Sequence, residues 1–448
     1  MRQIGFLLFC VALLFSNAAN AKGLDIQEVR SKGGLTAWLV EDHSIPVIAL
    51  KFAFRDAGSK NDGIEKQGLA RLASNTMDEG AGDLDSQAFQ KELQDLSITL
   101  RFSADRDNFG GNVKTLSRNK TRAFALLKIA LMSPRFDAEP LQRMRVSNES
   151  RIKSALMDPD WMAARLQNDK IFDGTPYALN SGGTLSSLKT ITAEDLKAFH
   201  KTLGRKALVV SVAGDMTPDE LSTLLDDVFG GMPEGNLMDD EPFSLKNAGA
   251  TYLYKQDIPQ TMIEIAQPGL ERTDPDYETA QVMNFILGSS GFGSRLMDEV
   301  REKRGLTYGI YTYLQTYVDT NTLQVSTSTA NENTAEVLSL ISQEWDKMKD
   351  TLVSDKELSD AKSYLIGSLP LALTSTDSIA GLLMTLQLER LPIDYLDQRA
   401  ERINAVTKED VQSISKRLLN TKDFTTILVG NPPDAKDATI VEALPNVE

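Results

Sequence analysis

Alternation of hydrophobic and polar positions predicts strands at two places in the chain. Residues 35–54 (LTAWLVEDHSIPVIALKFAF) and 261–270 (TMIEIAQPGL) each show this two-residue period, which is typical of strands. Residues 68–76 and 276–304 instead follow the spacing of helices. Groups of strands separated by helices favour an α+β fold, in which a mostly antiparallel sheet has helices packed on one face.

Two segments share one order of signals, which indicates an internal duplication. Each has a Thr-x-Glu-Asp start, a helix-period stretch, a short β-rich run and a glycine followed by polar residues and proline. Thr192 and Thr407 are predicted helix N-caps, with Asp195 and Asp410 completing a capping box in each copy. The repeat predicts two duplicated domains of similar fold.

Residues 229–249 form the predicted linker, because the segment is rich in glycine, proline and acidic residues. The chain of 448 residues then divides into an N-terminal domain at 22–228 and a C-terminal domain at 250–448.

The first 21 residues are predicted to be a secretory signal. Arg2 is followed by an apolar run from Ile4 to Phe15 and by small residues at 19–21, which predicts cleavage after Ala21 and export to the periplasm. Cys10, the one cysteine, lies within this signal, so the mature chain is expected to form no disulfide. No later segment approaches the roughly 20 apolar residues of a membrane span.

The formal net charge of -15 becomes one unit more negative when Arg2 is removed. This charge argues against nucleic acid and anionic membrane surfaces as partners and favours a small or peptidic substrate.

Neither a metal site nor a nucleophilic site is evident from residue types alone. Zinc needs three or four N, S or O ligands, whereas the chain has two histidines, His43 and His200, in unrelated contexts. The stretch SGGTLSS at Ser181 lacks the strand-nucleophile-helix context of a hydrolase, and the glycine clusters do not match a phosphate loop.

The stretch GSKNDGIEKQGLARLASNTMDEGAG resembles the insulinase/pitrilysin-type zinc peptidases, whose bacterial members include two-domain chains. In that family a Gly-Leu-Ala precedes His-x-x-Glu-His, and a turn with glycine and a small residue follows. Residues 68–70 and 80–81 match these flanks. Arg71 stands at the first histidine position, Ser74 at the glutamate and Asn75 at the second histidine, so the resemblance implies a degenerate zinc motif.

These substitutions remove the chemistry that the family's motif implies, in which two histidines bind zinc and the glutamate takes a proton from metal-bound water. Arg71 is a permanent cation, and Ser74 and Asn75 are poor ligands. Glu149 lies near the spacing of the family's third ligand, and an exposed helical glutamate is the favoured interpretation. We therefore expect this chain to bind no metal.

The second half is similar to the family's second-domain signature in LGSSGFGSRLMDEVREKRGLTYGIYTYL. Arg301 and Tyr308 are seven residues apart and match the arginine and tyrosine that reach across a clamshell into the zinc site of active members. The resemblance implies that Arg301 binds substrate carbonyls and that Tyr308 stabilises the oxyanion in a partner's site.

The resemblance implies the zinc-less subunit of a two-subunit peptidase, each subunit forming half of a clamshell. Its partner would be a homologous subunit that carries His-x-x-Glu-His and the zinc, and its substrate a peptide. An alternative is a stand-alone, metal-free protein that binds peptides or acts as a scaffold. An active enzyme with an unorthodox metal site is a third hypothesis, which the lack of paired histidines disfavours.

Overall fold

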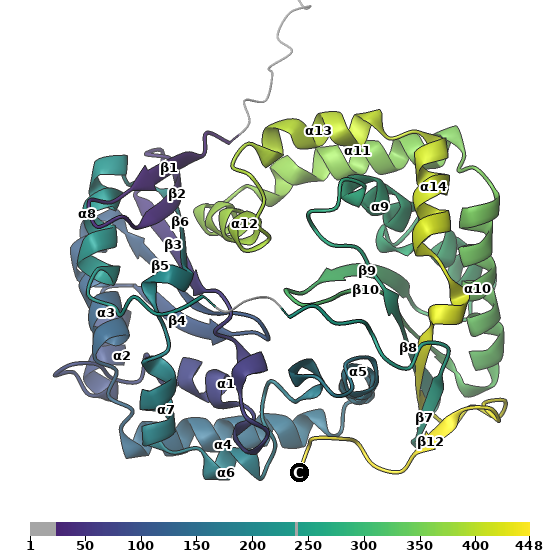
Figure 1. Cartoon of the computed structure of the whole chain (residues 1–448), viewed down its shortest axis with the longest axis horizontal. Helices are drawn as coiled ribbons and strands as arrows, with labels where there is room; N and C mark the ends of the chain where they lie inside the picture. Colours follow the sequence, from purple (N-terminus) through teal and green to yellow (C-terminus); the bar gives the residue numbers. More distant parts are fainter. Residues whose placement is uncertain (1–23, 238–240) are drawn as a thin grey trace, which may run out of the picture.

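Two six-stranded sheets stand side by side in the computed structural model, which describes residues 24–237 and 241–448 (Figure 1). The predicted signal at 1–21 and part of the predicted linker lie outside the described residues. The strands of each sheet come from one side of that linker.

The two sheets have the same topology over five strands. The first sheet has the order β1 (Gln27–Arg30), β2 (Thr36–Glu41), β6 (Leu208–Gly214), β3 (Val47–Phe54), β5 (Phe109–Leu116), β4 (Thr99–Ala104). The second has the order β12 (Thr439–Val441), β7 (Thr251–Lys255), β11 (Thr425–Gly430), β8 (Gln260–Pro268), β10 (Asn321–Ala330), β9 (Ile310–Thr316). The pairs β2–β6, β7–β11 and β7–β12 are parallel, and the other described pairs are antiparallel. The predicted α+β architecture with two mostly antiparallel sheets is confirmed.

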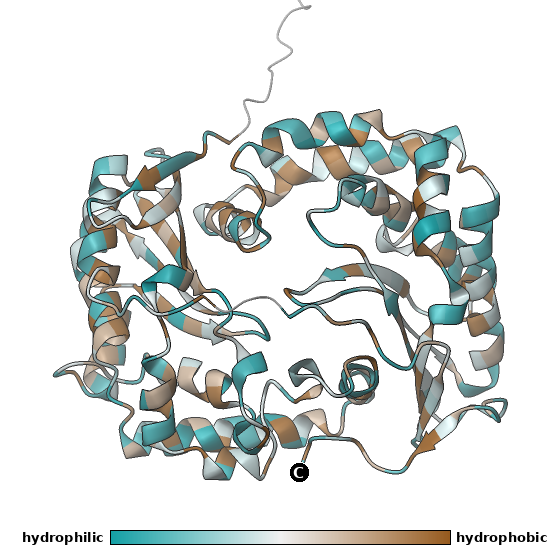
Figure 2. Ribbon diagram, viewed as in Figure 1, coloured by the Kyte–Doolittle hydropathy of each residue, from teal (hydrophilic) through white to brown (hydrophobic). Residues whose placement is uncertain are grey.

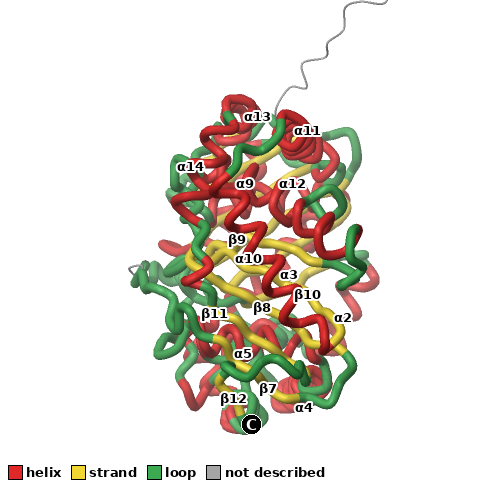
Figure 3. Tube along the Cα trace, turned by 90° about the vertical axis from the view of Figure 1, so that its right-hand side faces the viewer, coloured by secondary structure: helices red, strands yellow, loops and turns green. Residues whose placement is uncertain are grey.

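Several helices of each half pack on the outer face of its own sheet. The first half contains α1 (Leu69–Ser74), α2 (Ser86–Asp95), α3 (Lys120–Met132), α4 (Ala138–Ala155), α5 (Pro159–Ile171), α6 (Ser187–Thr190), α7 (Ala193–His200) and α8 (Pro218–Phe229). The second contains α9 (Tyr277–Asn284), α10 (Thr334–Asp350), α11 (Asp355–Ala372), α12 (Thr376–Leu388), α13 (Tyr395–Ala405) and α14 (Lys408–Leu418). Seen from the side, α9 and α10 cross over the strands of the second sheet (Figure 3).

The predicted helix at 276–304 is interrupted. After α9 the chain continues as two π-helical stretches, Phe285–Ser289 and Met297–Glu302, with a glycine-containing turn between them. Gly291 and Gly293 in this turn have positive φ angles of 67° and 98°, which a continuous right-handed helix does not allow.

Both predicted capping boxes are present. Thr192 caps α7 with Asp195, and Thr407 caps α14 with Asp410. Each helix leads into a central strand of its sheet, β6 or β11, so the sequence repeat marks equivalent positions in two copies of one fold.

Helix α12 of the second half packs on the inner face of the first sheet. Small side chains on that face, Ala49 and Ala213, are buried against Ala380 and Leu383 of α12. Ser211 Oγ of β6 donates a hydrogen bond to the carbonyl oxygen of Ala380 at 2.8 Å. The small residues therefore let a helix from the other half approach the sheet closely.

Helix α5 of the first half makes the reciprocal contact with the second sheet. Leu166 and Met162 of α5 are buried with Met262, Ile427 and Val429 of β8 and β11. Figure 2 shows hydrophobic residues on both of these helices and on the sheets beside them. The two halves are thus joined by exchanged helices as well as by the linker, an arrangement that the sequence did not predict.

Shortening the apolar side chains at these exchanged contacts should destabilise the whole chain. Leu166→Ala and Leu383→Ala each remove a fully buried side chain, so we expect the free energy of unfolding to fall by about 2–5 kcal/mol. Leu371→Ala is the matched control, because Leu371 is 75% exposed. Urea denaturation measures the difference, and equal stability of all three variants would contradict the packing.

The α5 contact also buries a carboxyl group. Glu264 of β8 accepts a hydrogen bond from Ser326 Oγ at 2.6 Å. Burial raises the pKa of Glu264 to about 7, and the nearby Asp160 of α5 raises it further. The folded chain therefore holds this proton more tightly than the unfolded chain does.

This contact predicts a pH-dependent stability. Because the folded pKa of Glu264 is raised from 4.5 to about 7, its stabilising contribution is complete below 4.5 and is lost as the pH rises through 7. Between about pH 5.5 and 8 the loss should be about 2 kcal/mol. Glu264→Gln should abolish this component in urea denaturation, whereas the exposed control Glu139→Gln should retain it. An unchanged pH slope in Glu264→Gln would contradict the assignment.

Candidate functional site

A buried aspartate fixes the start of α1, the helix that carries the degenerate zinc motif. Asp62 accepts backbone hydrogen bonds from Gly68 at 2.9 Å and from Ala70 at 3.1 Å. Burial raises the pKa of Asp62 to about 7, against the opposing effect of these bonds. The carboxyl group satisfies N–H groups at the first turn that have no partner within the helix.

Two glycines bring the turn at 181–183 against this helix start. Gly68 has a φ of 86°, and a Cβ there would lie 2.8 Å from the Cα of Gly183. Gly183 also has a φ of 86°, and its Cβ would lie 2.7 Å from the carbonyl oxygen of Gln67. The SGG segment at 181–183, for which no role was predicted, therefore positions α1 by close contact between backbones.

Arg71 and Asn75 lie one helical turn apart on the half-buried face of α1, whereas Ser74 points into the protein. Ser74 is 2% exposed, and its Oγ donates a hydrogen bond to the carbonyl oxygen of Arg71 at 2.8 Å. Of the three predicted motif positions, the structure brings two to one accessible face.

Asn148 of α4 is the residue that meets the second motif position. Asn75 Nδ2 donates a hydrogen bond to Asn148 Oδ1 at 2.9 Å, and Asn148 is 2% exposed. Glu149, the candidate from spacing, is half-buried, and no hydrogen bond or ion pair joins it to α1 within the described chain. The contact with Asn75 is therefore made by the residue next to Glu149, and the assignment of a third ligand position stays a prediction.

Arg71 is a half-buried cation without an ion-pair partner in the described part of the chain. Burial lowers the pKa of Arg71, Arg151 lowers it further by charge repulsion, and Asp105 opposes both. Its Nε–H is buried and has no acceptor. A guanidinium group only donates hydrogen bonds and cannot ligate a metal.

The donor set at this position does not fit zinc. Arg71 repels a cation, the Ser74 hydroxyl is bonded to backbone, and the Asn75 amide is bonded to Asn148. Within residues 24–237 and 241–448, no group of three or more His, Cys, Asp or Glu side chains is arranged to hold a metal ion.

Both histidines have other partners. His43 lies between Asp215 at 2.6 Å and Glu41 at 2.8 Å, and hydrogen bonds to these carboxylates raise its pKa, that to Asp215 most. His200 Nε2 lies 2.6 Å from the carbonyl oxygen of Leu131. They stabilise local structure rather than form a site.

Arg301 and Tyr308 lie on the second half and are not in contact with α1. The guanidinium carbon of Arg301 lies 4.3 Å from the centre of the Phe292 ring, in the glycine-containing turn. Tyr308, in the loop before β9, is 83% exposed. Among the described residues, no hydrogen bond or ion pair connects either side chain to Arg71, Ser74 or Asn75.

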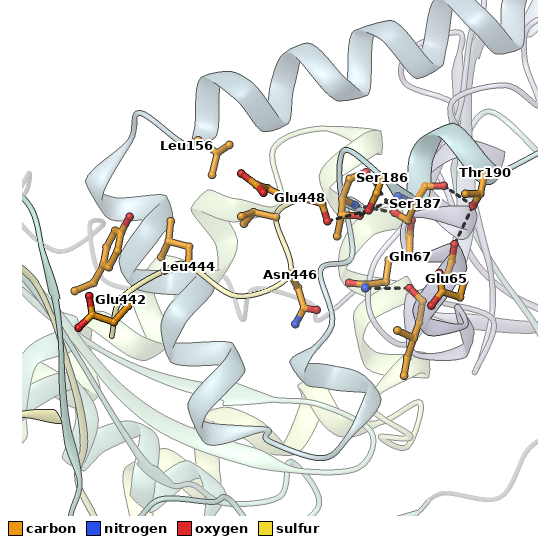
Figure 4. Close-up of a pocket in the computed structure, with 15 residues that line it drawn as sticks. Glu65, Gln67, Leu156, Ser186, Ser187, Thr190, Glu442, Leu444, Asn446 and Glu448 are labelled. Carbon is orange, nitrogen blue, oxygen red and sulfur yellow. Dashed lines mark hydrogen bonds between the residues drawn. The ribbon is translucent and has the colours of Figure 1, made fainter. Parts of the chain in front are cut away.

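A cavity of about 600 Å³ lies behind the start of α1, between the 64–67 and 184–190 segments and the chain end (Figure 4). Residues 442–448 run along it, where Ser186 Oγ donates to the carbonyl oxygen of Glu448 at 2.8 Å. Gln67 and Ser187, which line the cavity, also hold the turn that positions α1. The residues that line this cavity hold the segment before α1 in place. None of the three motif residues lines it.

The described chain has two halves of similar topology, and the residues at the degenerate motif do not fit a metal ion. A family described as the peptidase M16 inactive domain matches residues 190–365. The chain is 26% identical over 397 residues to a Helicobacter pylori protein named non-peptidase homolog YmxG, covering 87% of this chain and 90% of that one.

Two further comparisons agree. The beta subunit of the mitochondrial-processing peptidase of Saccharomyces cerevisiae is 22% identical over 87% of this chain and 88% of its own length. A solved structure of a peptidase M16 inactive domain from Pseudomonas fluorescens has a TM-score of 0.85 at 27% identity, covering 94% of this chain and all of that one. The chain is thus similar to M16 peptidases, and among its relatives are members that are named non-peptidase or inactive.

No described helix is both long and apolar enough to cross a membrane.

Rebuilding the ligands should restore metal binding and identify the third position. Arg71→His and Asn75→His place two imidazoles one turn apart, and Asn148→Glu adds a carboxylate beside them. We expect the triple variant to bind one zinc more tightly than the double variant does, measured by competition with a chromogenic chelator. Adding Glu149→Gln to the triple variant should leave the affinity unchanged. Loss of zinc on that change would assign the third position to Glu149 instead.

Proposed function

We propose that the chain is the zinc-less subunit of a periplasmic M16-type metallopeptidase complex. It would supply substrate-binding and oxyanion-stabilising groups to a homologous partner that carries His-x-x-Glu-His and zinc. The observation that carries the proposal is the combination of a metal position without ligands and a free Tyr308.

The exposed position of Tyr308 suits a role in another subunit's site. A phenolic hydroxyl that has no hydrogen-bond partner among the described residues can donate to an oxyanion. The guanidinium group of Arg301 packs on the Phe292 ring. Its N–H groups can still donate hydrogen bonds to peptide carbonyls.

An extended peptide has a place to bind beside these groups. β9 is the edge strand of the second sheet, so the backbone groups on its outer side are not paired within the sheet. Arg301 and Tyr308 precede β9 directly in the chain. A peptide added as a strand at this edge would be held by main-chain hydrogen bonds.

The periplasmic location rests on the predicted signal at 1–21. The beta subunit of the yeast processing peptidase, by its name, works within an assembly, which supports a paired role here. N-terminal sequencing of the mature chain tests the location, since it should begin at Lys22.

The alternative function is a stand-alone peptide-binding or scaffold protein. It is compatible with the same metal-free site, because peptide capture at a sheet edge needs no partner. Copurification separates the two: a chain with His-x-x-Glu-His should accompany this protein if it is a subunit.

Removing the hydroxyl of Tyr308 tests the subunit role. Tyr308→Phe should lower turnover of a peptide by the reconstituted pair by about 10²- to 10³-fold, because one donor to the developing oxyanion is lost. The pair should still assemble on gel filtration. Tyr364→Phe, another exposed tyrosine, is the matched control and should retain wild-type turnover. Wild-type turnover by an intact Tyr308→Phe pair would favour the scaffold.

Loss of Arg301 should act differently. Arg301→Ala removes a carbonyl contact that is made before the transition state, so we expect KM to rise as well as kcat to fall. Steady-state kinetics of the same pair measure both. A change in kcat alone would show that Arg301 does not bind the substrate.

A further inference from the structure

The degenerate metal position presents hydrogen-bond donors in place of metal ligands. In the described part of the chain, the buried Nε–H of Arg71 and the Nδ2–H of Asn148 have no acceptor. Asn148 is 2% exposed, so water does not replace the missing partner easily. Burying a donor without a partner is unfavourable, so an acceptor that reached these two groups would be stabilised.

These donors lie on two helix faces that meet. Arg71 and Asn75 are one turn apart on α1, and Asn148 and Arg151 are three residues apart on α4. The faces join where Asn75 Nδ2 donates to Asn148 Oδ1 at 2.9 Å. We call Arg71, Asn75, Asn148 and Arg151 the donor cluster.

The donor cluster carries positive charge that is not neutralised by an ion pair. Arg71 and Arg151 repel each other, and neither forms an ion pair with a described residue. Asp105 is the nearby carboxylate, but its Oδ1 accepts the N–H groups of Asp107 at 2.7 Å and Asn108 at 2.6 Å in its own turn. An added anion would therefore be stabilised by both arginines.

We propose that the donor cluster is an oxyanion-binding site whose ligand is the C-terminal carboxylate of a peptide. A guanidinium group and an amide N–H match the two oxygens of a carboxylate, and Arg71 and Asn75 are half-buried rather than sealed from solvent. The choice of a peptide rests on the proposed function. The position that holds a cation in zinc-bearing relatives thus selects an anion here.

Two peptides that differ at one group test the proposal. A short peptide lacking Asp and Glu is prepared with a free C-terminal carboxylate and, separately, with a C-terminal amide, both labelled at the N-terminus. Fluorescence anisotropy with the purified mature chain gives their Kd values. We expect the acid to bind about tenfold more tightly than the amide or better, since hydrogen bonds to a charged group are the stronger ones.

Substitutions in the cluster should remove this preference selectively. Arg71→Met should weaken the acid to the level of the amide and leave the amide unchanged, whereas Arg118→Met, at an exposed arginine before α3, should change neither. Asn148→Asp keeps the acceptor for Asn75 and adds a carboxylate within the donor cluster. This variant should lose the acid preference and melt no lower than the wild type.

The outcomes separate this proposal from the function on which it rests. Equal Kd values for the acid and the amide would contradict the oxyanion site but not peptide binding. The same holds if both Arg71→Met and Asn148→Asp still bind the acid more tightly than the amide. No binding of either peptide would overturn both.

Discussion

The need to cover both faces of each sheet is the constraint on which the rest of the structure depends. The helices of each half cover one face of its own sheet, which leaves apolar residues such as Ala49 and Met262 on the other. These residues are buried only if a helix packs on this second face of the sheet. That helix, α12 on the first sheet and α5 on the second, comes from the opposite half. Because α5 and α12 each pack on the sheet of the opposite half, the two halves form one packed unit. This packing sets the position of α1 relative to β9.

The residues at the degenerate motif present hydrogen-bond donors and positive charge rather than metal ligands. Asn75 still meets a residue of α4, as a second metal ligand would meet a third, but the contact is an amide hydrogen bond to Asn148. Arg71 adds a half-buried positive charge where a zinc site needs neutral or anionic ligands. Both features favour an electron-rich ligand over a cation.

Local signals in the sequence predicted much of this. The capping boxes at Thr192 and Thr407, the alternating strands and the three motif positions all depend on short-range chemistry, and the structure contains the boxes and strands as expected. The exchange of α5 and α12 depends on which helix reaches which sheet face, which no periodicity encodes. The role of Asn148 was missed because a one-residue shift rotates a side chain by about 100° around a helix. The break at Gly291 was visible only as a glycine cluster.

We propose that this chain binds no catalytic metal and contributes residues to the site of another subunit. The most direct measurement is the zinc content of the purified mature chain, determined by mass spectrometry after incubation with excess zinc and dialysis, together with peptidase activity of the same sample. We predict zinc far below one ion per chain and no hydrolysis. One zinc per chain with hydrolysis that a chelator abolishes would contradict the account.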